Sequence, residues 1–176
     1  FCGTQVVKQV VINGVDCCTS AGVTTTIPPS GLVVNSATPN ISGLTLTFTG
    51  ETIEVNGNIE IQNGYYLVLN NCTLKIATGK DITVRTGAHL TINHSFLSAC
   101  NNMWAGIKNN GGAVNIDNTS NIYDAKTGVT CDGNGSIVQI QNSTFDKNYT
   151  SISLTNGNYQ NSYIRGNSFK CTSNFI

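Results

Sequence analysis

The sequence contains unusually few charged residues. Only 10% of its 176 residues are charged, against about 25% in an average globular domain. Nine Lys and Arg residues balance nine Asp and Glu residues, so the formal net charge is zero. A protein that binds nucleic acid needs a basic surface to contact the phosphates, and none is apparent here. We therefore expect no nucleic-acid partner.

Long apolar runs and helical patterns are missing as well. No segment approaches the roughly 18 apolar residues of a membrane-spanning helix, so the chain is not expected to be membrane-inserted. No stretch keeps a 3.6-residue apolar period, which argues against amphipathic helices. The polar residues are instead 24 Asn and 22 Thr, and six Asn-Gly pairs provide turn signals. This composition predicts an all-β protein.

What the sequence does contain is a repeat of about 24 residues. Each copy has an alternating apolar strand, then an Asn-like residue, a small residue and an apolar residue. The anchor positions of the repeat, which are separated by 23, 24, 24 and 25 residues, are Asn71, His94, Asn118, Asn142 and Asn167. A fixed period of this length is typical of solenoids, because one repeat cannot bury its apolar face alone.

Three short strands can be assigned to each repeat, which predicts a parallel β-helix of about six turns. Alternate side chains point inward, so Leu69, Ile92, Ile116 and Ile140 should stack in one column. We expect the β-helix to span residues 41–176 and to be truncated at its C-terminal end. Residues 1–40 do not fit the repeat and are interpreted as an N-terminal cap or linker. The alternative is an irregular first turn of the same solenoid.

The anchor positions are interpreted as a structural ladder. Stacked side-chain amides can hydrogen-bond along a column, as they do in cross-β structure. His94 interrupts the column of asparagines, but an imidazole can still donate and accept. Catalysis is therefore not needed to explain His94.

The seven cysteines give no clean framework, because the count is odd and no C-x-x-C pair is present. Cys131 has the strand parity of an inward-facing residue and is expected to pack in the core. A pair of Cys2 with Cys17 or Cys18 is the only disulfide that we predict. No metal site and no cofactor are expected.

The segment from His94 to Val129 is the most specific part of the chain. It contains Met-Trp-Ala-Gly-Ile at Met103–Ile107, followed by Gly111-Gly112, Asp124-Ala125 and Gly128-Val129. This pattern resembles the right-handed parallel β-helix regions of large, adhesin-like proteins of Bacteroidetes bacteria, and the resemblance covers residues 41–171. Such proteins are often exported by the type IX secretion system. The resemblance implies a secreted or cell-surface location and a right-handed β-helix.

An enzyme is the main alternative, because polysaccharide lyases and glycoside hydrolases also use β-helices. Such chemistry needs carboxylates in matching positions on adjacent turns. Asp117 is expected to stack on Gln141 and Asn93, and only Asp124 and Asp146 come close to register. No catalytic residue is assigned, and whether the chain is an enzyme stays open, with the balance against it.

Aromatic residues are the candidates for ligand binding, since exposed rings can stack on sugar faces. The candidates are Trp104, Tyr65, Tyr66 and Tyr149. The alternative for Trp104 is that it packs at a corner of the solenoid. We predict a non-catalytic structural or adhesive module, a stiff rod that binds a glycan or a surface or secretion-machinery protein as part of a longer chain or assembly. The alternative is a carbohydrate-active enzyme whose site lies partly outside this chain.

Overall fold

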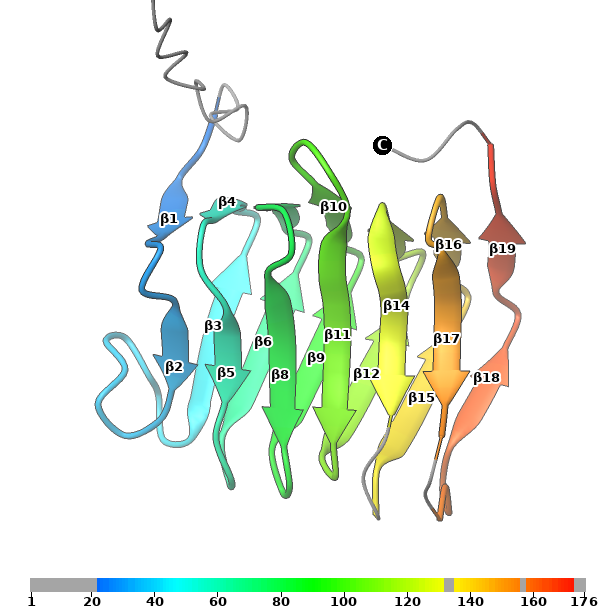
Figure 1. Cartoon of the computed structure of the whole chain (residues 1–176). Helices are drawn as coiled ribbons and strands as arrows, with labels where there is room; N and C mark the ends of the chain where they lie inside the picture. Colours follow the sequence, from blue (N-terminus) through cyan, green and yellow to red (C-terminus); the bar gives the residue numbers. More distant parts are fainter. Residues whose placement is uncertain (1–21, 132–134, 156–157, 173–176) are drawn as a thin grey trace, which may run out of the picture.

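The protein is a parallel β-solenoid of about six turns (Figure 1). The computed structural model describes residues 22–131, 135–155 and 158–172. Within these residues the strands form three parallel sheets and no helix. The chain passes through the three sheets in turn, so that each coil adds one strand to each sheet. This confirms the predicted all-β solenoid.

The strands are short, as expected for a coil of about 23 residues. Sheet A contains β1 (Thr25–Ile27), β4 (Thr52–Val55), β7 (Thr73–Ile76), β10 (Phe96–Ala99), β13 (Asn121–Tyr123), β16 (Thr144–Asp146) and β19 (Ser168–Lys170). Sheet B contains β2 (Leu32–Val34), β5 (Ile59–Ile61), β8 (Asp81–Arg85), β11 (Trp104–Asn110), β14 (Ala125–Cys131) and β17 (Thr150–Leu154). Sheet C contains β3 (Thr45–Thr49), β6 (Tyr66–Asn70), β9 (His89–Asn93), β12 (Ala113–Asp117), β15 (Ile137–Gln141) and β18 (Tyr163–Arg165).

The core consists of apolar columns that run along the solenoid axis. In sheet C, Leu69 pairs with Ile92, Ile92 with Ile116, and Ile116 with Ile140. All four side chains are buried. The predicted column is therefore confirmed, because the two-residue period of a strand fixes which side chains face inward.

Parallel pairing begins before residue 41, where the sequence predicted the start of the β-helix. β1 pairs with β4 and β2 pairs with β5, both in parallel. Residues 1–21, the first part of the predicted cap or linker, lie outside the described residues. The cap itself therefore stays a prediction.

The Met-Trp-Ala-Gly-Ile segment is explained by packing. Trp104 is completely buried, and its indole Nε1 donates a 2.7 Å hydrogen bond to the carbonyl oxygen of Tyr123 on the next coil. Gly106 has a φ of 105°, and the pairing register between β11 and β14 shifts between Gly106 and Ile107. A Cβ at Gly106 would lie 1.6 Å from the carbonyl oxygen of Thr127. Only glycine can form this bulge.

One covalent feature was not predicted. Cys100, which follows β10, is disulfide-bonded. The predicted pairing of Cys2 with Cys17 or Cys18 falls outside the described residues. Cys131 is buried in the core, as its strand parity indicated. Among the described residues there is no helix of the length and apolarity needed to cross a membrane.

Candidate functional site

The corner between sheets C and A is made by residues with left-handed backbone. Asn71, His94, Asn118 and Asn142 have φ values of 53°, 48°, 53° and 48°. Asn adopts this region more easily than most residues, because its short polar side chain can hydrogen-bond locally. The repeat therefore places Asn here to turn the chain from one sheet into the next.

The fifth corner residue is Gly166, with a φ of 63°, and the predicted anchor Asn167 lies one position further on. Gln141 pairs with Arg165, which puts Gly166 opposite Asn142. The repeat is therefore 24 residues at this step, not 25. The prediction failed because glycine occupies the turn position in this coil and the Asn follows it by one residue.

The corner side chains form no amide ladder with one another. All four are exposed. His94 Nδ1 lies 3.1 Å from the carbonyl oxygen of Asn118 and 3.1 Å from Thr119 Oγ1. The Asn118 amide donates instead to Asn93 Oδ1, at 2.5 Å. Along the part of the chain that the structure describes, backbone conformation, rather than side-chain bonding, is what these four positions share.

A second column, just after the corner, carries the hydrogen bonds that the ladder was expected to make. Its members are Cys72, Ser95, Ser120, Ser143 and Asn167, which face inward from successive coils. Ser95 Oγ accepts from the N–H of Cys72 at 3.0 Å, and Ser120 Oγ accepts from the N–H of Ser95 at 3.2 Å. Asn167 Oδ1 accepts from the N–H of Ser143 at 2.9 Å, and its Nδ2 donates to Ile140. These side chains join each coil to its neighbour.

A groove of about 640 Å³ follows this corner along the solenoid. Cys72, Ser95 and Ser143 lie at its buried centre, between two more accessible columns. One wall is formed by the corner residues, including Asn71, His94, Asn142 and Gly166. The other wall is formed by outward residues of sheet A, which are Thr73, Phe96, Asn121, Thr144 and Ser168.

The outer surface of sheet C carries a separate polar column. Asn93 Nδ2 lies 3.4 Å from Asn70 Oδ1, and Gln141 Nε2 donates to Asp117 Oδ2 at 2.5 Å. Arg165 donates two hydrogen bonds to Gln141 Oε1, at 2.9 and 2.7 Å. Asp117 stacks between Asn93 and Gln141, as predicted. The Asp117 carboxylate is thus hydrogen-bonded to the side-chain amide of Gln141.

The four aromatic candidates are not brought together. Trp104 is completely buried, so it cannot stack on a sugar at the surface; the structure supports the alternative that it packs inside the solenoid. Tyr65 packs against the core. Tyr66 begins β6 and stacks on His89, with ring centroids 4.6 Å apart. Tyr149 is 78% exposed but precedes β17 on a different sheet. These residues therefore form no common site.

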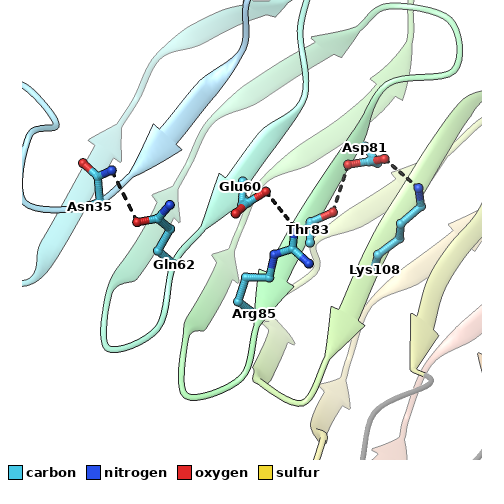
Figure 2. A network of polar contacts seen from close by, with 7 residues as sticks. All are labelled: Asn35, Glu60, Gln62, Asp81, Thr83, Arg85 and Lys108. Carbon is cyan, nitrogen blue, oxygen red and sulfur yellow. Dashed lines mark hydrogen bonds and ion pairs between the residues drawn. The ribbon is translucent and has the colours of Figure 1, made fainter.

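Charged side chains on sheet B form two ion pairs (Figure 2). Arg85 lies 2.9 Å from Glu60, and Lys108 lies 2.7 Å from Asp81. The hydrogen bond and charge of Glu60 raise the pKa of Arg85. Thr83 donates to Asp81 Oδ1 at 3.0 Å. The solvent-accessible Arg85–Glu60 pair contributes about 0–1 kcal/mol, and within each pair the opposite charges offset one another.

Asp124 and Asp146 lie on adjacent coils but not in the same register. Asp146 pairs with Tyr123, and the N–H of Asp124 donates to the carbonyl oxygen of Asp146 at 3.3 Å. Burial raises the pKa of Asp124, whose Oδ1 has no hydrogen-bond partner among the described residues. Burial also acts to raise the pKa of Asp146, but hydrogen bonds from Thr172 and the charge of Lys147 outweigh it and lower that pKa.

Neither carboxyl of this pair is accessible. Asp124 is 9% exposed and Asp146 is 2% exposed. Asp146 accepts from both Thr172 N–H, at 3.0 Å, and Thr172 Oγ1, at 2.6 Å. A glycosidase pair must flank the bond that it cleaves, with room for a sugar ring. Over residues 22–131, 135–155 and 158–172, no three His, Cys, Asp or Glu side chains are grouped so that they could hold a metal ion.

The structure thus shows a parallel β-solenoid with a neutral, polar groove along one corner. Comparison of the chain with protein-family models, curated proteins and solved structures found no match.

Proposed function

We propose that this chain is a non-catalytic structural module of a secreted or cell-surface bacterial protein, where it forms a stiff rod that binds a glycan or a protein partner. The observation that carries this proposal is the uninterrupted parallel pairing of all three sheets along the described coils. Each coil is held by backbone bonds and by buried side chains such as Ser95. Such an array supports its own length and offers the same surface repeatedly.

Two observations support an extracellular location. Cys100 is disulfide-bonded, and disulfides persist mainly in oxidising compartments. The segment Met103–Ile107 resembles β-helix regions of Bacteroidetes surface proteins. That resemblance is also the sole support for an association with type IX secretion.

The alternative function is a carbohydrate-active enzyme with part of its site outside this chain. The observation in its favour is that burial and hydrogen bonding shift the pKa values of Asp124 and Asp146 in opposite directions. Two neighbouring carboxyls whose pKa values are pushed apart are what an acid–base pair requires. The burial of both carboxyls weighs against this alternative.

One experiment separates the two functions. The protein is incubated with soluble neutral polysaccharides and with polygalacturonate. Binding of each polymer to the protein is measured, and cleavage is followed by solution viscosity, new reducing ends and unsaturated products. The proposed module should retain a polymer, or bind a surface protein, without shortening any polymer. Chain shortening that is lost in both Asp124→Asn and Asp146→Asn would establish the enzyme instead.

A further inference from the structure

We propose that the corner groove binds a linear neutral polysaccharide that lies parallel to the solenoid axis. This inference rests on the proposed function, because it names the site and ligand class of the binding module. The groove is lined by equivalent positions of successive coils, from Thr73 in β7 to Ser168 in β19. An elongated ligand along the axis would therefore meet the same kind of residue at every coil.

The lining matches a neutral ligand. No Lys, Arg, Asp or Glu is among the groove residues. A polyanion or polycation would therefore find no opposite charge there to offset its desolvation. The groove presents hydroxyl and amide groups instead, which can both donate and accept hydrogen bonds. This is the chemistry that sugar hydroxyls require.

Several of these polar groups have no hydrogen-bond partner among the described residues. In the described part of the chain, no hydrogen bond is made by the side chains of Asn71, Thr73, Asn142 and Thr144. The two asparagines lie on one wall and the two threonines on the other. Buried neighbours such as Ser95 are already satisfied within the solenoid. The unsatisfied groups are thus the accessible ones, on both sides of the groove.

Phe96 provides an apolar surface in the same wall. It is the outward residue of β10 between Thr73 and Asn121. Its ring centroid lies 5.0 Å from that of Tyr123 and 5.4 Å from Lys75 Nζ, so both side chains limit its movement. An aromatic face beside hydrogen-bonding groups suits a pyranose, which has apolar C–H faces and polar edges.

The dimensions favour a glycan over a protein strand. Neighbouring coils are about 4.8 Å apart, which is close to the length of one pyranose residue in an extended chain. Protein interfaces concentrate their binding energy in Trp, Tyr and Arg anchors. Phe96 and His94 are the only aromatic rings among the groove residues, so such anchors are not provided.

The test uses a matched pair of variants. Thr144→Trp places a bulky ring in the groove, whereas Thr130→Trp places it on sheet B. Both threonines are half-buried, outward positions on strands that are paired on both sides. Phe96→Leu and Tyr66→Leu form a second pair that compares the groove with the Tyr66–His89 stack. Circular dichroism and melting temperatures establish that each variant is folded.

Binding is measured with soluble mixed-linkage β-glucan, linear xylan and linear mannan, and with polygalacturonate as the anionic control. We expect at least one neutral polymer to bind, and Thr144→Trp and Phe96→Leu to weaken it about tenfold or more. Thr130→Trp and Tyr66→Leu should bind as the parent does. Polygalacturonate should bind more weakly than the neutral polymer.

Each other outcome has a distinct meaning. Equal binding by Thr144→Trp and Thr130→Trp overturns the groove assignment but leaves a glycan-binding rod. Binding to none of the neutral polymers overturns the polysaccharide inference, and a protein ligand would then be the remaining form of the proposed function. Shortening of a bound polymer overturns the non-catalytic function, whichever variant pair is affected.

Discussion

The buried hydroxyl of Ser95 accepts a 3.0 Å hydrogen bond from the backbone N–H of Cys72, one coil away. Ser95 Oγ also lies 2.9 Å from the carbonyl oxygen of Asn93 and 3.2 Å from that of Leu69. One side chain therefore closes a gap between coils at the corner, where the sheet ladders are interrupted.

Ser95→Ala should lower stability by about 1–3 kcal/mol, because it leaves the buried N–H of Cys72 without an acceptor. Chemical denaturation gives the free energy of unfolding. Thr91→Ala, on the outer face of sheet C, is the control and should change it by less than about 0.5 kcal/mol. Equal changes in the free energy of unfolding for the two substitutions would mean that the Ser95 hydroxyl does not stabilise the fold.

Asn167→Ala tests the corrected register. The substitution removes the acceptor of the Ser143 N–H and the donor to Ile140, each at 2.9 Å. It should cost about 1–3 kcal/mol. Asn142→Gly, at a positive-φ corner, should change stability by no more than about 0.5 kcal/mol, since glycine adopts this backbone freely. The reverse order of the two effects would restore Asn167 to the corner column.

Trp104 is the sole tryptophan, so its fluorescence reports on one buried position. We expect blue-shifted emission that iodide does not quench until the protein unfolds. Trp104→Phe should lower stability by about 1–3 kcal/mol, because the Tyr123 carbonyl loses its donor. Strong iodide quenching of the native protein would show that the ring is accessible and would restore Trp104 as a ligand candidate.

Gly106→Ala should destabilise the protein by more than about 4 kcal/mol, the range of severe core and backbone conflicts. Its Cβ would overlap the carbonyl oxygen of Thr127. The control is Gly79→Ala, at a positive φ of 71° with open space around the position. That substitution should cost about 1–2 kcal/mol from backbone strain alone. Comparable losses at both sites would contradict the close approach at Gly106.

Asp124 predicts a pH dependence of stability. Because burial raises the pKa of this carboxyl, the folded state holds its proton more tightly than the unfolded chain does. Its favourable contribution is full below the ordinary Asp pKa and is lost as the pH rises through the raised value. Asp124→Asn should therefore melt at a higher temperature than the parent at neutral pH, with the difference closing in acid.

The pH dependence of stability that Asp146 causes should have the opposite sign. Its lowered pKa means that it stabilises the fold above the ordinary Asp pKa and that this contribution is lost as the pH falls through the lowered value. Asp146→Asn should melt below the parent at neutral pH and approach it in acid. Melting temperatures from pH 2 to pH 8 of all three proteins decide both signs, and a shift in the same direction for both variants would contradict the assignment.

The inward columns could be predicted from sequence because strand alternation leaves little choice. Once Leu69 faces inward, the repeat length fixes Ile92, Ile116 and Ile140 in the same column. The corner was harder to predict, since Asn occurs both at the positive-φ position and beside it. The coil with Asn118 adds Thr119, also at positive φ, so the following Ser120 joins the buried column one residue later.

The groove and its chemistry could not be obtained in this way. Phe96 and Thr144 alternate with core residues in the sequence like any other outward position. Their shared wall exists only because the corner residue turns the chain beside them. The Cys100 disulfide was missed as well, since the spacing of the cysteines does not show which of them pair.

The winding of one chain into stacked coils also has a mechanical consequence. The bonds between coils lie along the axis, so tension applied at the two ends loads them directly. A coil of about 23 residues that is pulled free lengthens the molecule by roughly 80 Å at about 3.5 Å per residue, while the remaining rod shortens by only about 5 Å. Under load the protein would therefore yield one coil at a time and act as a damper between whatever is attached to its two ends.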